Sequence, residues 1–266
     1  MDILITGAAS GIGRAAALAF AKDARMRGEA APHLQLVDLN ADKLKETADL
    51  LSGSAEVVTE VADLSKPDES SRLVERAVSA FGGLDVLVSN AGIGVPGALR
   101  TLSLVDYERT FAVNTRAALL LGQAAFPHLS KRKGAIIATA SIAATAPTPV
   151  LGVYSASKAA LISIMKQMAL EWGPYGIRCN TVSPGPTFTG MTPQYAEPDI
   201  RGARERAIPV GRVGAPEDIA NAIVFLARPE SSYISGVDVA VDGGLLTTLM
   251  LGPGFHPEKM GEGSSR

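Results

Sequence analysis

Short apolar runs alternate along the chain with longer amphipathic stretches, a pattern typical of a parallel sheet covered by helices on both faces. The apolar runs predict strands near residues 2–6, 34–38, 56–61, 84–89, 134–140, 177–182 and 236–241. The amphipathic stretches predict helices near residues 11–24, 41–51, 67–81, 103–130, 153–172 and 216–227. The hydrophobic pattern therefore predicts an α/β fold.

Neither an internal repeat nor an interdomain linker interrupts this pattern, which predicts a single domain over residues 1–251. Apolar residues make up 47% of the 266 residues, enough for one large core. Segment 186–210 contains four prolines and little periodicity, so we expect a mobile substrate lid there. Residues 252–266 carry Gly, Pro and Ser and predict an irregular C-terminal tail.

Charge and cysteine content narrow the classes of partner. The chain has 25 basic and 27 acidic side chains, a net charge of −2 and no basic stripe, so we expect no nucleic-acid partner. Its one cysteine, Cys179, excludes an intramolecular disulfide and fits a reducing cytosol. The three histidines lack metal-ligand spacing, so no metal site is predicted. With no signal peptide or long apolar span, we expect a cytoplasmic protein without membrane contact.

A glycine-rich turn, Thr6-Gly-Ala-Ala-Ser-Gly-Ile-Gly13, follows the first predicted strand and opens the first predicted helix. Glycines permit a tight turn and let a pyrophosphate approach the backbone, while the helix N-terminus favours its negative charge. A glycine-rich turn alone is weak evidence, but its place between strand and helix is the one this mechanism requires. We therefore expect a dinucleotide site.

The second predicted strand ends at Asp38, which favours NAD over NADP. A carboxylate there can accept hydrogen bonds from the adenosine ribose hydroxyls and repels a 2′-phosphate. Neither Ser10 nor Leu39 offers a cation for that phosphate. The alternative is that Asp38 caps helix 41–51. The stretch 25–32 is longer than a turn needs and extends the first helix or forms an extra loop, which puts the register of Asp38 in question.

Tyr154 and Lys158 are four positions apart, so on a helix they share a face. A phenol titrates near ~10, and acting as a base near neutral pH needs a pKa lower by about 3 units, roughly 4 kcal/mol. A lysine ~4 Å away supplies about 1 kcal/mol in water and about 4 kcal/mol at an effective dielectric near ~20. The pair alone also fits a packed ring beside a solvated amine. As a catalytic pair it needs a partly dry cleft and a second positive charge, which an oxidised nicotinamide would provide.

Together these motifs resemble the short-chain dehydrogenase/reductase family, of the classical type, over nearly the whole chain. The matching pieces are Thr6-Gly-x-x-x-Gly-Ile-Gly13, Asp63-Leu64, Asn90-Ala-Gly92, Asn114, Ser141, Tyr154-x-x-x-Lys158, Pro184-Gly185 and Val241-Asp-Gly-Gly244. Ser89 departs from the family, in which an asparagine often stands at that position. The resemblance implies a doubly wound, Rossmann-type, seven-stranded parallel sheet in the order 3-2-1-4-5-6-7.

The resemblance also implies catalytic roles. Tyr154 would exchange a proton with the substrate oxygen, and Lys158 would lower the pKa of Tyr154 and bind the nicotinamide ribose. Ser141 would donate to the substrate carbonyl oxygen, and Asn114 would anchor a water that links Lys158 to solvent. Each of the last two also has a purely structural alternative, since Ser141 can cap a strand end and Asn114 can satisfy a helix kink.

In the cofactor site that the resemblance implies, Asp63 and Leu64 meet the adenine and Thr189 meets the nicotinamide carboxamide. Thr187 replaces a more usual valine or isoleucine and would act through its main-chain amide. The full set expected to bind the cofactor is Gly7, Ser10, Gly11, Ile12, Gly13, Asp38, Leu39, Asp63, Leu64, Asn90, Ala91, Gly92, Tyr154, Lys158, Pro184, Gly185, Thr187 and Thr189.

We expect reversible hydride transfer between nicotinamide and a secondary alcohol or its ketone. The substrate pocket should be apolar and modest in size, which favours a hydroxysteroid, a cyclic alcohol or a hydrophobic hydroxy-acyl compound over a sugar. Its expected lining is Ile93, Ser141, Ala143, Pro149, Val150, Leu151, Tyr154, Pro186, Phe188 and Met191.

The resemblance implies pairing of the long helices 103–130 and 153–172 in a dimer, and a homotetramer built through the last strand and helix. Two other functions stay open. One is an NADPH-dependent carbonyl or 3-oxoacyl reductase, against which Asp38 argues; an enoyl reductase fits less well, because its tyrosine and lysine are more widely spaced. The other is a catalytically silent NAD(H)-binding regulator.

Overall fold

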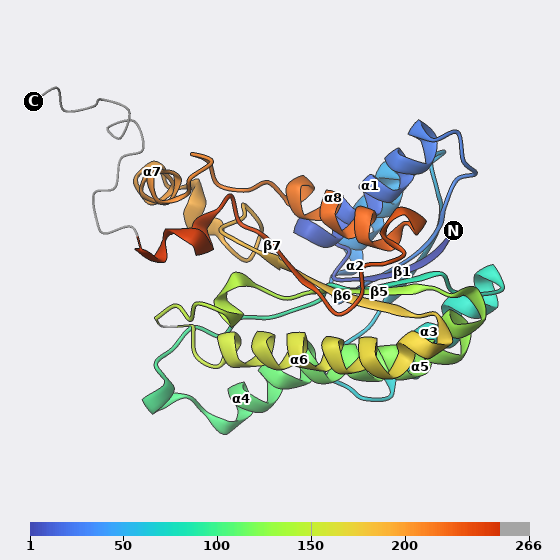
Figure 1. The fold of residues 1–266 in the computed structure, drawn as a ribbon, viewed down its shortest axis with the longest axis horizontal. Helices are drawn as coiled ribbons and strands as arrows, with labels where there is room; N and C mark the ends of the chain where they lie inside the picture. The colour runs from blue at the N-terminus through green and yellow to red at the C-terminus, as the bar shows by residue number, and fades with distance from the viewer. Residues whose placement is uncertain (150, 251–266) are drawn as a thin grey trace, which may run out of the picture.

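The computed structural model describes residues 1–149 and 151–250, in which seven parallel strands form one sheet (Figure 1). Their order, β3-β2-β1-β4-β5-β6-β7, confirms the expected doubly wound fold. The strands are β1 (Asp2–Thr6), β2 (His33–Asp38), β3 (Glu56–Val61), β4 (Val86–Ser89), β5 (Ala135–Thr139), β6 (Arg178–Pro184) and β7 (Asp238–Val241).

Helices cover both faces of the sheet (Figure 1). The layer above it in the figure contains α1 (Gly11–Met26), α2 (Ala41–Leu50) and α8 (Pro216–Ala227). The layer below it contains α3 (Glu69–Phe81), α5 (Ala117–Arg132) and α6 (Tyr154–Trp172). Because successive strand residues point to opposite faces, Ile3 and Ile5 join the core with Phe20 of α1, and Leu4 joins the core with Leu73 of α3.

The predicted helix 103–130 is wrong as a single helix. It consists of α4 (Leu104–Phe111), a π-helical turn (Ala112–Arg116) and then α5. The turn contains Asn114, whose side-chain amide bonds the main chain of Ile93 on a separate loop. A π-turn inserts one extra residue into a helical turn and so re-aims a side chain, which accounts for the interruption.

Segment 186–210, expected to be irregular, contains a 3₁₀ turn (Pro193–Ala196) and helix α7 (Pro198–Ala207). Pro198 lies in the first turn of α7, where a missing N–H costs little. No residue of α7 is buried, which explains why the sequence shows no helical hydrophobic period there. Val150 and the predicted tail 252–266 lie outside the described residues.

The strand order places β1 beside β4, with later strands continuing on one side and β2 and β3 on the other. In open α/β sheets, ligands bind in the crevice at the carboxyl ends of strands where the order reverses. The residues that follow β1 and β4 are therefore the first place to look for a site. Among the described residues, every helix is too short or too polar to cross a lipid bilayer.

Candidate active site

The glycine-rich turn after β1 is packed so closely that side chains do not fit. A Cβ on Gly13 would lie 2.1 Å from the carbonyl oxygen of Gly7, and one on Gly7 would lie 2.8 Å from Asn90 Nδ2. Gly7 also has a φ of +68°, a conformation that favours glycine. The turn delivers the chain into α1, whose first N–H groups have no intrahelical acceptor and can bind an anion.

Asn90 ties this turn to two other strands. Its Nδ2 donates to the carbonyl oxygen of Thr6 at 3.0 Å, and its Oδ1 accepts from the Thr139 hydroxyl at 3.0 Å. The Thr6 hydroxyl in turn accepts from the main-chain N–H groups of Asn90 and Ala91, at 3.0 and 3.1 Å. The carboxyl ends of β1, β4 and β5 are thereby joined by polar contacts into one platform.

Asp38 is the last residue of β2, so the longer connection before the strand does not shift its register. The structure shows that connection as α1 continued to Met26, followed by residues 27–32. Asp38 Oδ2 accepts from Ala9 N at 3.0 Å and Oδ1 accepts from Asn40 N at 3.1 Å. The alternative in which Asp38 caps α2 is wrong, because the Asn40 side chain makes that bond to Lys43 N at 3.0 Å.

Other predicted cofactor residues gather around the same crevice. A Cβ on Gly11 would touch Thr189 at 3.4 Å, and one on Gly92 would lie 3.2 Å from Lys158 Nζ. The structure thus brings segment 186–210 against the glycine turn and the loop after β4 against Lys158. Glycine at these points lets the main chain lie close to its neighbours, so the residues present fit a dinucleotide bound along the backbone of this edge.

Two predicted cofactor residues have their side chains turned elsewhere. The Leu64 side chain is buried in the core with Val37 and Leu73, which leaves only its main chain for an adenine. Asp63 Oδ1 accepts from Ser65 N at 3.0 Å, and hydrogen bonds from Ser65 lower the pKa of Asp63. Gly185 packs on Asp242, where a Cβ would lie 2.6 Å from Asp242 Cα, so this contact links the Pro184-Gly185 and Val241–Gly244 motifs.

Tyr154 begins α6, and Lys158 lies one turn further along the same helix. Lys158 is 3% exposed, and its Nζ donates to the main-chain oxygen of Thr139 at 2.7 Å and lies 5.8 Å from the centre of the Tyr154 ring. Ser141 Oγ accepts from Ala143 N at 3.1 Å, capping the short 3₁₀ turn Ile142–Ala144. That bond uses a lone pair, so the Ser141 hydroxyl keeps its hydrogen as a donor, and the hydroxyl also hydrogen-bonds Tyr154.

Burial raises the pKa of Tyr154, and the nearby Ser141 hydroxyl lowers it only in part. The raised pKa is compatible with the role expected of Lys158, which needs a second positive charge beside it. The physical reason for the shift is burial of the phenol, which disfavours its charged form; burial also lowers the pKa of Lys158, from 10.5 to about 8. A lowered pKa of Tyr154 requires another positive charge in the crevice.

Asn114 links three segments around this pair. Its Oδ1 accepts from Ile93 N at 2.8 Å, and its Nδ2 donates to Ile93 O at 2.9 Å and to Ser157 Oγ at 3.0 Å. Ser157 Oγ donates to the main-chain oxygen of Tyr154 at 2.7 Å. Ser141 thus caps a 3₁₀ turn, and the Asn114 side chain bonds other segments, at Ile93 and Ser157, instead of the helix around the π-turn; the catalytic roles of both stay predictions.

The residues predicted to line the substrate pocket come from three segments that follow β4, β5 and β6. Ala143 is buried, Leu151 pairs with Gly97, and Phe188 and Met191 expose about half of their side chains. A Cβ on Gly94 would touch the Tyr154 ring at 3.8 Å, which brings the loop after Ile93 to the catalytic ring. The exposed side chains of Phe188 and Met191 present apolar surface on the segment after β6.

Sequence reasoning missed several polar residues that hold the site together. The main-chain oxygen of Thr139 accepts a hydrogen bond from Lys158 Nζ, and the Ser157 hydroxyl bonds both Asn114 and the main chain of Tyr154. Thr192 Oγ1 donates to Thr187 O at 2.6 Å and accepts from Thr189 N at 3.0 Å. One signal was present for Thr6 and Thr139, since both are polar residues that end otherwise apolar strands. Ser157 and Thr192 carry no such signal, because their partners are defined only by the fold.

Comparison with known proteins gives consistent matches. Residues 7–246 match the family described as enoyl-(acyl carrier protein) reductase. A glucose 1-dehydrogenase of Gluconobacter oxydans (strain 621H) is 37% identical over 249 residues, covering 91% of this chain and 91% of that protein.

Two crystal structures from Brucella melitensis share the fold. One, a short-chain dehydrogenase/reductase described as glucose/ribitol dehydrogenase, is 33% identical with a TM-score of 0.84, covering 91% of this chain and 95% of that one. The other, a 3-ketoacyl-(acyl-carrier-protein) reductase complexed with NADH, is 32% identical with a TM-score of 0.82, covering 91% of this chain and 97% of that one.

Proposed function

The chain belongs to the short-chain dehydrogenase/reductase family, and on that premise we propose that it transfers a hydride reversibly between a secondary alcohol or its ketone and nicotinamide, with NAD preferred. The observation that carries the proposal is the convergence of Ser141, Tyr154, Lys158 and Asn114 beside the loop after β4, which itself packs on the glycine-rich turn. The dinucleotide, when bound, supplies the acceptor or donor of the hydride.

The chain's own residues would hold the dinucleotide along the carboxyl edge of the sheet. The N-terminus of α1 faces the pyrophosphate, and Asp38 accepts from the adenosine ribose. Lys158 uses one of its three N–H donors on Thr139, so two remain for the nicotinamide ribose and Tyr154. Thr189 beside Gly11 is close enough to the turn to contact the nicotinamide end.

Tyr154 acts as the acid/base. In alcohol oxidation its phenolate takes the hydroxyl proton of the substrate, and in reduction its phenol returns that proton to the substrate oxygen. Ser141 donates its hydroxyl hydrogen to the same oxygen and stabilises the charge that develops on it. Asn114 fixes the loop at Ile93 and, through Ser157, the first turn of α6, and it anchors the water that returns protons from Lys158 to solvent.

Because the pKa of Tyr154 is raised in the protein alone, its phenol can act as a base only when something else favours the phenolate. A positive charge from an oxidised dinucleotide, added to that of the Lys158 ammonium, would favour the phenolate, so Tyr154 would act as a base with the oxidised cofactor bound. This dependence couples proton removal to cofactor binding.

Asp38 supports NAD over NADP, since its carboxylate would repel a 2′-phosphate. Segment 186–210, which carries Phe188, Met191 and α7, would act as the lid of a single domain. Its exposed apolar side chains favour a hydroxysteroid, a cyclic alcohol or a hydrophobic hydroxy-acyl compound. A sugar is the contrasting candidate, because a glucose 1-dehydrogenase is among the similar proteins.

A panel of alcohols incubated with NAD, and with NADP in parallel, tests the proposal through the absorbance of the reduced cofactor. The panel should contain steroids, cyclic diols, hydroxy acids and aldoses in matched amounts. We expect turnover with NAD on at least one apolar secondary alcohol. No turnover on any member, together with tight NADH binding, would favour the silent regulator instead.

A second candidate is a 3-oxoacyl reductase, since one of the similar structures is a 3-ketoacyl-(acyl-carrier-protein) reductase. The four-residue spacing of Tyr154 and Lys158 supports carbonyl chemistry over enoyl chemistry. Reduction of an acetoacetyl thioester with NADH and with NADPH separates this candidate from the alcohol dehydrogenase. Faster reduction with NADPH would favour it.

We further propose a homotetramer in the cytoplasm. Large apolar side chains are exposed on α4 and α6, at Leu104, Val105 and Leu170, and others lie near the last strand, at Phe225 and Tyr233. A groove of about 500 Å³ between α5 and α6, lined by Phe126 and Trp172, supports pairing of α5 and α6 with the same helices of a second copy.

Sedimentation velocity measures the mass of the assembly in solution, and a monomer at micromolar concentration would refute the homotetramer. Fractionation of the native host tests the location.

A further inference from the structure

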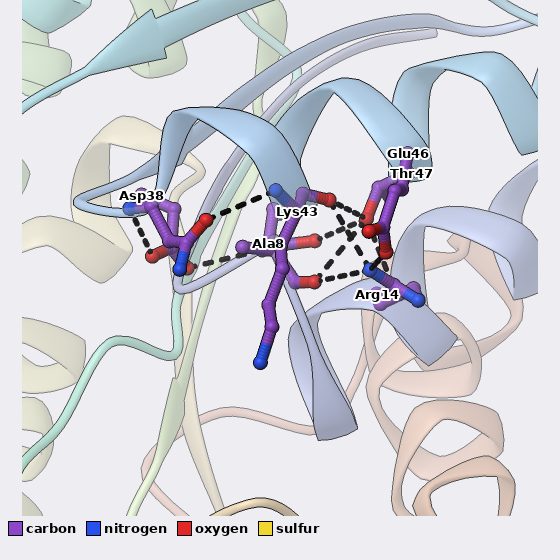
Figure 2. Close-up of polar contacts among 8 residues, drawn as sticks. Ala8, Arg14, Asp38, Lys43, Glu46 and Thr47 are labelled. Carbon is purple, nitrogen blue, oxygen red and sulfur yellow. Dashed lines mark hydrogen bonds and ion pairs between the residues drawn. The ribbon is translucent and has the colours of Figure 1, made fainter.

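A closed network of hydrogen bonds lies behind the glycine-rich turn and connects Asp38 to α1 and α2. Figure 2 shows Asp38 on one side of Ala8 and Arg14 on the other, with α2 passing above them. Asp38 takes both of its hydrogen bonds from main-chain groups, Ala9 N at 3.0 Å and Asn40 N at 3.1 Å. The direction in which its carboxylate points therefore depends on where the peptide between Ala8 and Ala9 is held.

Two side chains hold the carbonyl oxygens of that segment. Thr47 Oγ1 lies 3.1 Å from Ala8 O, and Arg14 Nη2 donates to Ala9 O at 2.6 Å. Arg14 Nε also donates to Thr47 Oγ1 at 2.9 Å, so the two side chains hold each other in place (Figure 2). Thr47 is fully buried, where an unmet polar group is costly.

The single hydroxyl hydrogen of Thr47 has three possible acceptors, Ala8 O and Lys43 O at 3.1 Å each and Ala9 O at 3.5 Å, the last of which already receives the bond from Arg14. Lys43 O already receives a bond from Arg14 Nη2 at 3.2 Å, whereas Ala8 is fully buried and has Thr47 as its donor among the described residues. Satisfying both oxygens therefore requires the Thr47 hydrogen to be given to Ala8 O. This fixes the turn from the side opposite the crevice.

Arg14 bonds this turn directly, and its positive charge is already paired with a carboxylate. It pairs with Glu46 at 3.0 Å in addition to its three other acceptors. The donors of Nε and Nη2 are thus directed to the turn and to α2, and they are not available to hold a 2′-phosphate beside Asp38.

We propose that Thr47 and Arg14 are positioning residues for cofactor selection, which aim Asp38 at the adenosine ribose by fixing the peptides on either side of Ala9, Thr47 through Ala8 O and Arg14 through Ala9 O. The inference rests on the proposed function, in which Asp38 distinguishes NAD from NADP. Neither residue touches the cofactor. Their effect is on the affinity ratio between the two dinucleotides, which a role limited to joining α1 and α2 would leave unchanged.

The test measures dissociation constants for NADH and NADPH by fluorescence titration in the full chain. Thr47→Val removes the hydroxyl at nearly constant volume and should weaken NADH binding about tenfold, with NADPH little changed. Thr47→Ser keeps the hydroxyl and should keep the wild-type ratio. Thr181→Val is the matched control, since it removes a buried threonine hydroxyl that bonds Asp238, on β6, away from the turn.

Asp38→Ala distinguishes the role of Asp38 in cofactor selection from the role of Thr47, which acts through Asp38. It should lower the NADH preference more than Thr47→Val, and Thr47→Val added to Asp38→Ala should lower it no further, because the threonine acts through the aspartate. A wild-type ratio in Thr47→Val, when Asp38→Ala changes it, would overturn the inference alone. An unchanged ratio in Asp38→Ala would refute the ribose assignment and the inference with it.

Should Thr47→Val fail to fold, Arg14→Met and Arg14→Lys replace it, since the Arg14 side chain is 26% exposed and tolerates change better. Arg14→Met should reduce the NADH-to-NADPH affinity ratio several-fold. Arg14→Lys keeps the charge without the forked geometry and should give an intermediate ratio. A ratio equal to wild type in Arg14→Met would overturn the inference.

Discussion

The two ends of the crevice differ in how far their polar groups are already bonded to protein. At the adenosine end, Asp38 takes two main-chain N–H groups and Arg14 reaches four acceptors. At the proposed catalytic end, Lys158 Nζ has one acceptor among the described residues, Thr139 O, which leaves two of its three N–H groups for a ligand. Under the proposed function, this difference means that selection of the cofactor depends on contacts already present in the fold, whereas the proton chemistry depends on bound ligands.

The two ends also differ in how strongly burial disfavours their charged groups. Asp38 lies beside main-chain donors and near the engaged guanidinium of Arg14. Tyr154 and Lys158 are buried, which raises the pKa of the phenol and lowers the pKa of the amine, so in both groups the charged form is disfavoured. Binding of a charged ligand therefore has a larger effect on protonation at the catalytic end.

The rigidity of the adenosine end gives the largest expected effect. Gly13→Ala places a Cβ 2.1 Å from Gly7 O, and relieving that clash moves the turn. At about 2–3 kcal/mol of overpacking, NADH affinity should fall about a hundredfold. Gly173→Ala is the control, since it has nothing within 4 Å and an ordinary helical φ of −54°. NADH binding by Gly13→Ala within threefold of wild type would contradict a preformed turn.

At the catalytic end, burial of Lys158 should make stability depend on pH. Its pKa falls from 10.5 in the unfolded chain to about 8 in the fold. Between these values the unfolded chain holds a proton that the folded protein has released, so stability rises with pH across this window. The penalty is complete below about pH 8 and disappears as pH approaches 10.5, a gain of roughly 3 kcal/mol.

Urea unfolding of wild type and Lys158→Met across that pH range measures this gain. Contributions with the opposite sign, such as the Cys179 thiol whose pKa burial raises to about 12, are common to both proteins and cancel in the difference. Wild type should gain stability relative to Lys158→Met as pH rises. A difference that is flat with pH would mean that Lys158 is not desolvated as the structure indicates.

The smallest expected effect concerns the lid. Thr192 accepts from Thr189 N at 3.0 Å and donates to Thr187 O, which holds Thr189 beside Gly11. Thr192→Val should weaken NADH binding about fivefold, the cost of about one hydrogen bond, and Thr192→Ser should restore it. ADP-ribose, which lacks nicotinamide, should bind both variants like wild type. An equal loss for ADP-ribose would show that Thr192 acts on the whole turn.

The parts of this comparison that the sequence predicts are those encoded by local spacing. The seven strands, the glycine turn, Asp38 at the end of β2 and the shared helical face of Tyr154 and Lys158 all depend on residues close together in the chain. The π-turn at Asn114, helix α7 and the Arg14–Thr47 network do not. Each depends on a partner far along the chain or on a helix without a buried face, so no periodicity marks it.

The direction of the Tyr154 pKa shift illustrates the same limit. Spacing places an amine near the phenol, but it does not report that both groups are buried or that the amine is bonded to Thr139. Burial depends on the packing of α6 against the sheet and the loops beside it. The sign of the shift could therefore be obtained only from the fold.

The most direct test of the catalytic claim is Tyr154→Phe, assayed for kcat with the best alcohol of the panel and for NADH affinity by fluorescence. Removing one hydroxyl leaves the ring and Lys158 in place, so NADH should bind nearly as in wild type while turnover is abolished. A kcat of about a tenth of wild type or more would contradict the role of Tyr154 as the acid/base, since loss of a positioned proton-transfer group costs about 10²–10⁴-fold.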